Sequence, residues 1–115
     1  MESLIITLFQ SRDFAHFKHL ETSSYARHMA LNEYYDGIVD HMDALAELQM
    51  ANGVAIRCPK SIEIPDVDEV KYFDALATTL NKLSKDTGMR EDMRNVIIDI
   101  QTLVNGLLYK LKMLK

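Results

Sequence analysis

The feature that most constrains the fold of this chain is a long amphipathic segment near its middle. Between positions 28 and 47 the apolar residues recur at steps of four, three, four and three, which is the spacing of one face of an α-helix. These residues are Leu31, Tyr35, Ile38, Met42 and Leu45. The segment therefore predicts a long helix with one buried face.

Similar periodicity predicts three more helices, so that the four span about 2–20, 24–51, 67–85 and 90–114. The hydroxyl residues at 21–24 can cap the second helix, and Asn52-Gly53 is a good stop after it. Asp66 or Asp68 can cap the third helix. The segment 54–65 holds both prolines and should be extended, since a residue before proline avoids the helical region.

Two helices on each side of one longer connection predict an all-α four-helix bundle that forms one domain over residues 1–115. The short connections make helices 1 and 2, and helices 3 and 4, antiparallel neighbours. A linker of about 14 residues, at roughly 3.3 Å per residue, can run the length of the bundle as a ferritin-like crossover between helices 2 and 3. The alternative is an up-down bundle in which this linker loops back at one end.

The composition narrows the function classes. With 13 basic and 17 acidic residues, the chain carries no strong nucleic-acid signal. One cysteine, Cys58, excludes an intramolecular disulfide and suits a reducing compartment. The start of the chain does not resemble a signal peptide, and no apolar run is long enough to span a bilayer. We therefore expect a cytoplasmic protein without a membrane partner.

Histidines and acids follow the buried face of the second helix. His28 lies twelve residues after His16, and Asp43 and Glu47 lie about 60° and 100° round the helix from His28. Imidazole and carboxylate together suit iron, zinc or manganese. The last 74 residues contain no histidine, which excludes a di-iron site of the bundle-core type. Metal ligands would therefore come from helices 1 and 2, and a row at their edge implies a second subunit.

These residues resemble the ferroxidase region of the DNA-protecting starvation proteins (Dps), the small dodecameric branch of the ferritin superfamily. That family's spacing of two histidines, an aspartate and a glutamate is matched by His16, His28, Asp43 and Glu47, and the text DHMDALAE at 40–47 is similar to the family's. In the family, the histidines of one subunit and the acids of its two-fold mate hold iron for oxidation. The resemblance implies a mini-ferritin that binds iron, or another divalent metal, and acts as a ferroxidase.

The stretch from His16 to Asp36 also resembles short ferritin-like proteins encoded by tailed phages. The chain departs from the Dps pattern in lacking its tryptophan near the first histidine and in carrying Asn32 where a further aspartate assists metal binding. The alternative function is therefore a non-catalytic helical assembly or interaction module that keeps the scaffold without metal. In that case the row of His, Asp and Glu makes polar interface contacts without metal. Taken singly, His28 can also be a hydrogen-bonded core or interface residue, and Asp43 and Glu47 a solvated flank.

Two histidines have open roles: His19 is either an alternative ligand or packed at the corner between helices 1 and 2, whereas His41 reads as a surface residue. Self-association is expected because helix 4 is apolar over more than half its circumference, with Tyr34 and Val39 adding apolar area on helix 2. We predict at least a two-fold homodimer with helices 1 and 2 in contact.

Overall fold

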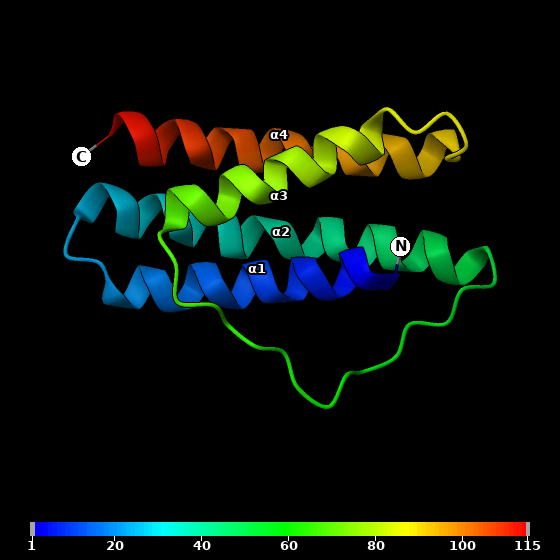
Figure 1. The fold of residues 1–115 in the computed structure, drawn as a ribbon, viewed down its shortest axis with the longest axis horizontal. Coiled ribbons are helices and arrows are strands. Elements are labelled where there is room, and N and C mark those ends of the chain that lie inside the picture. The colour runs from blue at the N-terminus through cyan, green and yellow to red at the C-terminus, as the bar shows by residue number, and fades with distance from the viewer. Residues whose placement is uncertain (1, 115) are drawn as a thin grey trace.

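The computed structural model describes the backbone of residues 2–114 and the side chains of residues 4–114. It contains four helices, α1 (Glu2–Glu21), α2 (Tyr25–Ala51), α3 (Glu69–Ser84) and α4 (Glu91–Met113), and no strand among the described residues (Figure 1). Each helix begins and ends within two residues of its predicted bounds. The all-α four-helix class is confirmed. No helix in this part of the chain is long and apolar enough to cross a membrane.

Local side-chain chemistry sets the helix ends. The hydroxyl of Ser24 accepts a hydrogen bond from the backbone N–H of Arg27 at 3.2 Å, which satisfies one of the free donors at the start of α2. At α3 the cap is Asp68 and not Asp66, because the Asp68 carboxylate accepts from the N–H groups two and three residues later. Gly53 follows α2 with φ of 86°, a left-handed conformation that glycine adopts without a steric penalty.

The linker between α2 and α3 is a crossover, as predicted, and the up-down alternative is wrong. It runs beside α1 from the end of the bundle where α2 finishes to the end where α2 begins, so α2 and α3 point the same way (Figure 1). Gln10 in the middle of α1 donates to the Glu63 carbonyl at 2.9 Å, and Lys18 near the end of α1 lies 3.6 Å from the Asp66 carboxylate. From the first contact to the second, the residue numbers rise both along α1 and along the linker. This is the order expected when two segments run parallel.

The core draws on all four helices and is richest in aromatic rings between α1, α2 and α3. Phe14 of α1 stacks on Tyr72 at 4.1 Å between ring centroids, and Phe73 meets both Phe14 and Tyr34 edge-on. Tyr34 is only 1% exposed, so the expectation that it adds apolar surface to α2 is wrong. Its hydroxyl lies 2.7 Å from the Ser11 hydroxyl, which makes its burial possible without an unsatisfied polar group.

The broad apolar face of α4 is buried inside this chain. Helix α4 packs against both α2 and α3, and two partners cover more of its circumference than one would. Its buried residues are Met93, Ile97, Ile100, Val104, Leu107, Leu108 and Leu111. The width of this face is therefore explained by packing within one subunit, and it is not evidence for self-association.

Candidate functional site

Three histidines meet where α1 passes into α2. The rings of His19 and His28 stack with their centroids 3.6 Å apart and their planes 23° apart. The His16 ring lies 6.0 Å from that of His19 and stacks on Tyr35 at 4.1 Å. His19 is 8% exposed, whereas His16 is exposed to solvent. The two sequence-predicted histidines, His16 and His28, are thus brought to the same corner, together with His19.

His19 and His28 are tied together by a reciprocal pair of hydrogen bonds. The Nδ1 atom of His19 lies 2.7 Å from the backbone oxygen of His28, and Nδ1 of His28 lies 2.9 Å from the backbone oxygen of His19. A carbonyl oxygen only accepts, so each Nδ1 must carry the proton and donate it. In the neutral ring the lone pair is then on Nε2. This is also how protein histidines are held when Nε2 binds a metal.

The stacking excludes one way in which His19 could act as a metal ligand. A metal binds in the plane of an imidazole ring, and the planes of His19 and His28 are nearly parallel at a separation of 3.6 Å. One ion at about 2.0–2.1 Å from both nitrogens cannot lie in both planes. His19 and His28 are therefore not a pair of ligands to one ion, and the buried His19 packs at the corner.

A chain of polar side chains continues from the histidines along α2. The Tyr35 hydroxyl donates to the Asn32 side-chain oxygen at 2.6 Å, and the Asn32 amide donates to the Asp36 carboxylate at 3.1 Å. Asn32 holds the place of the further aspartate in the Dps pattern, and an amide at this point can donate where an aspartate cannot. The network orients Tyr35 against the ring of His16.

The two sequence-predicted acids lie far from the histidines of the same chain. Asp43 and Glu47 are exposed, one turn apart in the second half of α2. At 1.5 Å per residue they lie roughly 22–29 Å along the helix from His28. The described residues of a single chain contain no group of three or more His, Cys, Asp or Glu side chains that could hold a metal. The structure thus brings the histidines together and leaves both acids apart from them.

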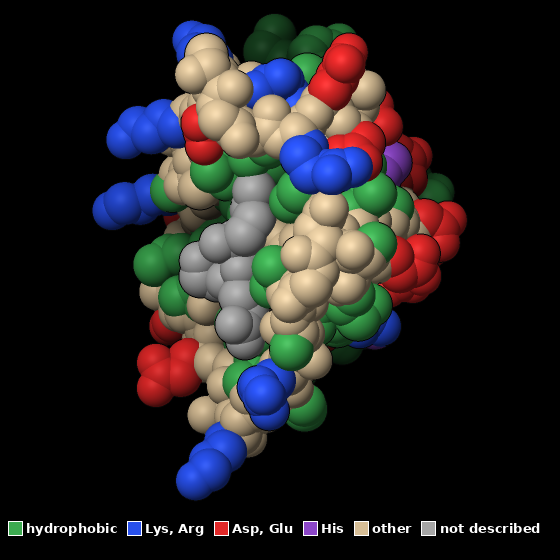
Figure 2. All heavy atoms as spheres, turned by 90° about the vertical axis from the view of Figure 1, so that its right-hand side faces the viewer, with side chains coloured by type: hydrophobic (Ala, Val, Ile, Leu, Met, Phe, Trp, Pro, Cys, Tyr) green, Lys and Arg blue, Asp and Glu red, His purple; other side chains and the backbone are tan. Residues whose placement is uncertain are grey.

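Exposed acids are a general feature of this helix. Besides Asp43 and Glu47, α2 exposes Glu33, Asp36 and Asp40. Figure 2 shows acidic side chains gathered on one side of the end at which α2 finishes. In the sequence alone, the two predicted acids were not distinguishable from such a solvated face.

An exposed apolar patch borders the histidine corner, and the sequence reasoning missed it. Phe17 is 57% exposed and Leu20 is 67% exposed, and both line a shallow pocket with Asp13 and His16. We call Phe17 and Leu20 the corner patch. Both residues lie off the buried face of α1, and that position was a signal available in the sequence. Large apolar side chains exposed beside a polar cluster are typical of protein interfaces.

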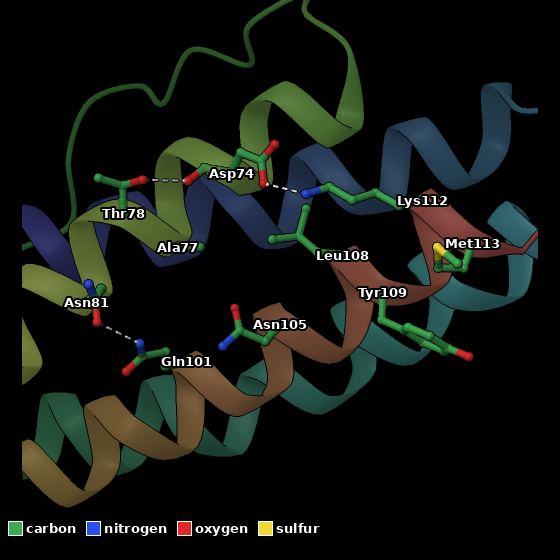
Figure 3. Close-up of a pocket in the computed structure, with 10 residues that line it drawn as sticks. All are labelled: Asp74, Ala77, Thr78, Asn81, Gln101, Asn105, Leu108, Tyr109, Lys112 and Met113. Carbon is green, nitrogen blue, oxygen red and sulfur yellow. Dashed lines mark hydrogen bonds and ion pairs between the residues drawn. The ribbon is translucent and has the colours of Figure 1, made fainter.

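A second concave surface lies between α3 and α4, away from the histidines (Figure 3). Its wall carries the carboxamides of Asn81, Gln101 and Asn105, with Gln101 donating to Asn81 at 3.3 Å. An ion pair between Lys112 and Asp74, 3.0 Å long, closes one side. This groove is lined by no histidine or cysteine, and its polar atoms are chiefly carboxamides and the Lys112–Asp74 ion pair, which offer hydrogen bonds.

The chain was also compared with known proteins. The model of a family of unknown function, DUF5856, matches residues 19–111, which include α2, α3 and nearly all of α4. Three of the four predicted site residues fall within the match, and His16 lies just before it. No curated protein and no solved structure matches the chain.

Proposed function

The chain belongs to the DUF5856 family, whose function is unknown, and we propose that it binds iron, as Dps-like mini-ferritins do, at a site shared by two subunits. The observation that carries this proposal is the placement of the four candidate ligands. His16 and His28 lie at one end of the α1–α2 pair, and the exposed Asp43 and Glu47 lie towards the other end. Two copies packed antiparallel on this face bring the histidines of each to the acids of the other.

The register of such a dimer follows from the positions along α2. When His28 lies opposite Glu47 of the partner subunit, the two-fold axis passes near residues 37 and 38, because paired positions in an antiparallel arrangement have a constant sum. His16 on α1 stacks on Tyr35, so its level along α2 is close to that residue. In the same register Asp43 of the partner subunit lies opposite residue 32, about one helical turn from that level, and so comes near His16. One register therefore supplies both contacts.

The donor set fits the proposed substrate. The Nδ1 hydrogen bond of His28 leaves its Nε2 lone pair for a metal, and two carboxylates add negative charge. Such a mixed nitrogen and oxygen set suits Fe(II). The residues bind and orient the ion, while oxygen or peroxide accepts the electrons in oxidation to Fe(III). The corner patch beside His16 supplies apolar contact area for the same interface.

The test is an anaerobic titration of the protein with Fe(II), followed by addition of peroxide and by measurement of the absorbance of Fe(III). Saturable binding is expected in the wild type and should be lost, at least tenfold in affinity, in Asp43→Ala and His28→Ala. Asp99→Ala is the matched control, since it removes an exposed acid of α4, a helix that has no part in the proposed site. Equal binding by the Asp43 and Asp99 variants would show that the site assignment is wrong.

A second candidate is a helical assembly module without metal chemistry. It is favoured by one observation, that His19 and His28 bond to each other's backbone and so already have a structural role at the corner. The histidine pair then holds the corner within one chain, and the corner patch makes a packed interface between copies. Metal analysis of the purified protein separates the candidates, because stoichiometric iron or zinc contradicts this second one.

A further inference from the structure

An apolar pocket lies between the first half of α1 and the crossover, at a distance along α1 from the histidine corner. Its volume is about 350 Å³, at the lower end of the range for small-molecule sites. The apolar side chains that line it are chiefly Ile5, Ile6, Phe9, Ile56 and Ile62. Phe9 remains 37% exposed, so apolar area is left facing the space.

The crossover forms the outer wall of this pocket without regular structure of its own. Residues 54–68 contain neither helix nor strand in the structure. They are fastened to α1 beyond the pocket, by the bond from Gln10 to the Glu63 carbonyl and by the ion pair of Lys18 with Asp66. The wall over the pocket is therefore anchored at one side and can adjust to a ligand without breaking a helix or a sheet.

One basic residue lines the pocket, and a second lies close to it in the sequence. Arg57 is among the lining residues, and Lys60 follows three positions later on the same segment. Both side chains are exposed, and neither has an ion-pair or hydrogen-bond partner among the side chains that the structure describes. A cation beside an apolar cavity complements a ligand with an anionic head and an apolar tail.

We propose that this pocket binds a medium-chain fatty acid, with its alkyl chain among the isoleucines and Phe9 and its carboxylate at Arg57. A methylene group takes up about as much space as a water molecule, about 30 Å³. The pocket therefore holds roughly ten carbon atoms, as in decanoate. This inference does not depend on the metal site, because none of its residues belongs to the histidine corner.

Isothermal titration of the whole protein with hexanoate, octanoate and decanoate tests the proposal directly. The dissociation constant should fall about fourfold for each added methylene, until the pocket is filled near ten carbons. The chain contains no tryptophan, so Phe9→Trp places a single fluorescent reporter in the pocket. Its emission should change with decanoate, while that of Phe17→Trp, in the corner patch, should not.

Matched variants separate a built site from surface adsorption. Ile62→Trp fills the pocket and should weaken decanoate binding at least tenfold, whereas Val67→Trp, on an exposed part of the same crossover, should not. Arg57→Gln should weaken decanoate severalfold and leave neutral decanol unchanged, with Lys85→Gln as the charge control. Absence of saturable binding, equal binding by the Ile62 and Val67 variants, or sedimentation with phosphatidylcholine vesicles in place of binding to free decanoate would overturn the proposal.

Discussion

His16 and His19 lie one turn apart on α1, yet the structure gives the two imidazoles different surroundings. His19 is buried, stacks on His28 and bonds to a backbone oxygen of α2, while His16 remains exposed on the face of Tyr35. His19 therefore links two helices, whereas His16 is free to meet a ligand or a partner. A residue-level experiment can separate these roles.

We expect His19→Ala to lower the free energy of unfolding by about 2–3 kcal/mol, from a lost hydrogen bond, an unpaired carbonyl of His28 and a small cavity. His16→Ala should cost under about 1 kcal/mol, because its ring is exposed. Urea unfolding followed by circular dichroism measures both. Equal costs would mean that the corner is not held by His19.

We predict that the folded protein loses stability at alkaline pH because of the buried phenol of Tyr34. Burial raises the pKa of the Tyr34 phenol above its ordinary value, with a smaller opposing effect from the hydrogen bond to Ser11. The folded state therefore binds this proton more tightly than the unfolded state, in which tyrosines ionise at about pH 10. The contribution of protonated Tyr34 to the free energy of unfolding is complete below that pH and is lost as the pH rises further.

The measurement is the unfolding free energy of wild type and Tyr34→Phe between about pH 8 and pH 11. At pH 8 the variant should be less stable by about 1 kcal/mol, through loss of its buried hydrogen bond. Above pH 10 its stability should fall less steeply than that of the wild type. Some slope remains, because burial also raises the pKa of Tyr72. Parallel curves would contradict the assignment.

At the scale of helices, the start of α3 is where the crossover ends and where three elements meet. Asp68 caps α3, and Arg27 from the first turn of α2 forms an ion pair with Glu69. The start of α3 is thereby tied to the end of the bundle at which α2 begins. This tie fixes α3 parallel to α2, as the crossover requires (Figure 1).

Asp68→Ala should lower the unfolding free energy by about 1 kcal/mol, the usual cost of removing an N-cap. Asp66→Ala is the matched control, since its carboxylate is fully exposed and makes only a surface ion pair, worth under about 1 kcal/mol. Thermal unfolding of the two variants compares them. A larger loss in the Asp66 variant would indicate that the crossover contact, and not the cap, holds α3 in place.

For the whole molecule, we base the prediction of self-association on the outer face of α1 and α2. The apolar face of α4 is buried, and Tyr34 is part of the core. Phe17 and Leu20 remain as large apolar side chains exposed beside the histidines. The prediction of a dimer thus keeps its proposed contact, helices 1 and 2, but rests on different residues.

Light scattering at micromolar concentration should give a mass of at least twice the 13.2 kDa of one chain. Leu20→Glu should shift the protein towards monomer, since it places a charge in the apolar contact. Tyr109→Glu, an equally exposed site on α4, should leave the mass unchanged. A monomeric wild type would contradict the dimer and, with it, the shared metal site.

Much of the candidate site could be predicted from the sequence. The features that could not be predicted were missed for physical reasons. Helical spacing alone places His16 and His28 near the α1–α2 corner and separates them from Asp43 and Glu47 along α2. Spacing does not report which imidazole nitrogen meets a carbonyl oxygen, so the bonded pair of His19 and His28 was missed. The exposure of the corner patch was also missed, because an apolar residue outside the buried face of a helix can be covered by any neighbouring element.

By itself, the sequence determined the four helices, their caps and their breaks, since periodicity, capping and proline act over a few residues. Only the tertiary structure decided the route of the crossover, because a linker of this length can return or cross and only distant contacts such as Gln10 with Glu63 distinguish the two. It likewise decided that Tyr34 is buried and Leu20 exposed. Burial depends on which helices meet, and that is a property of the packed bundle.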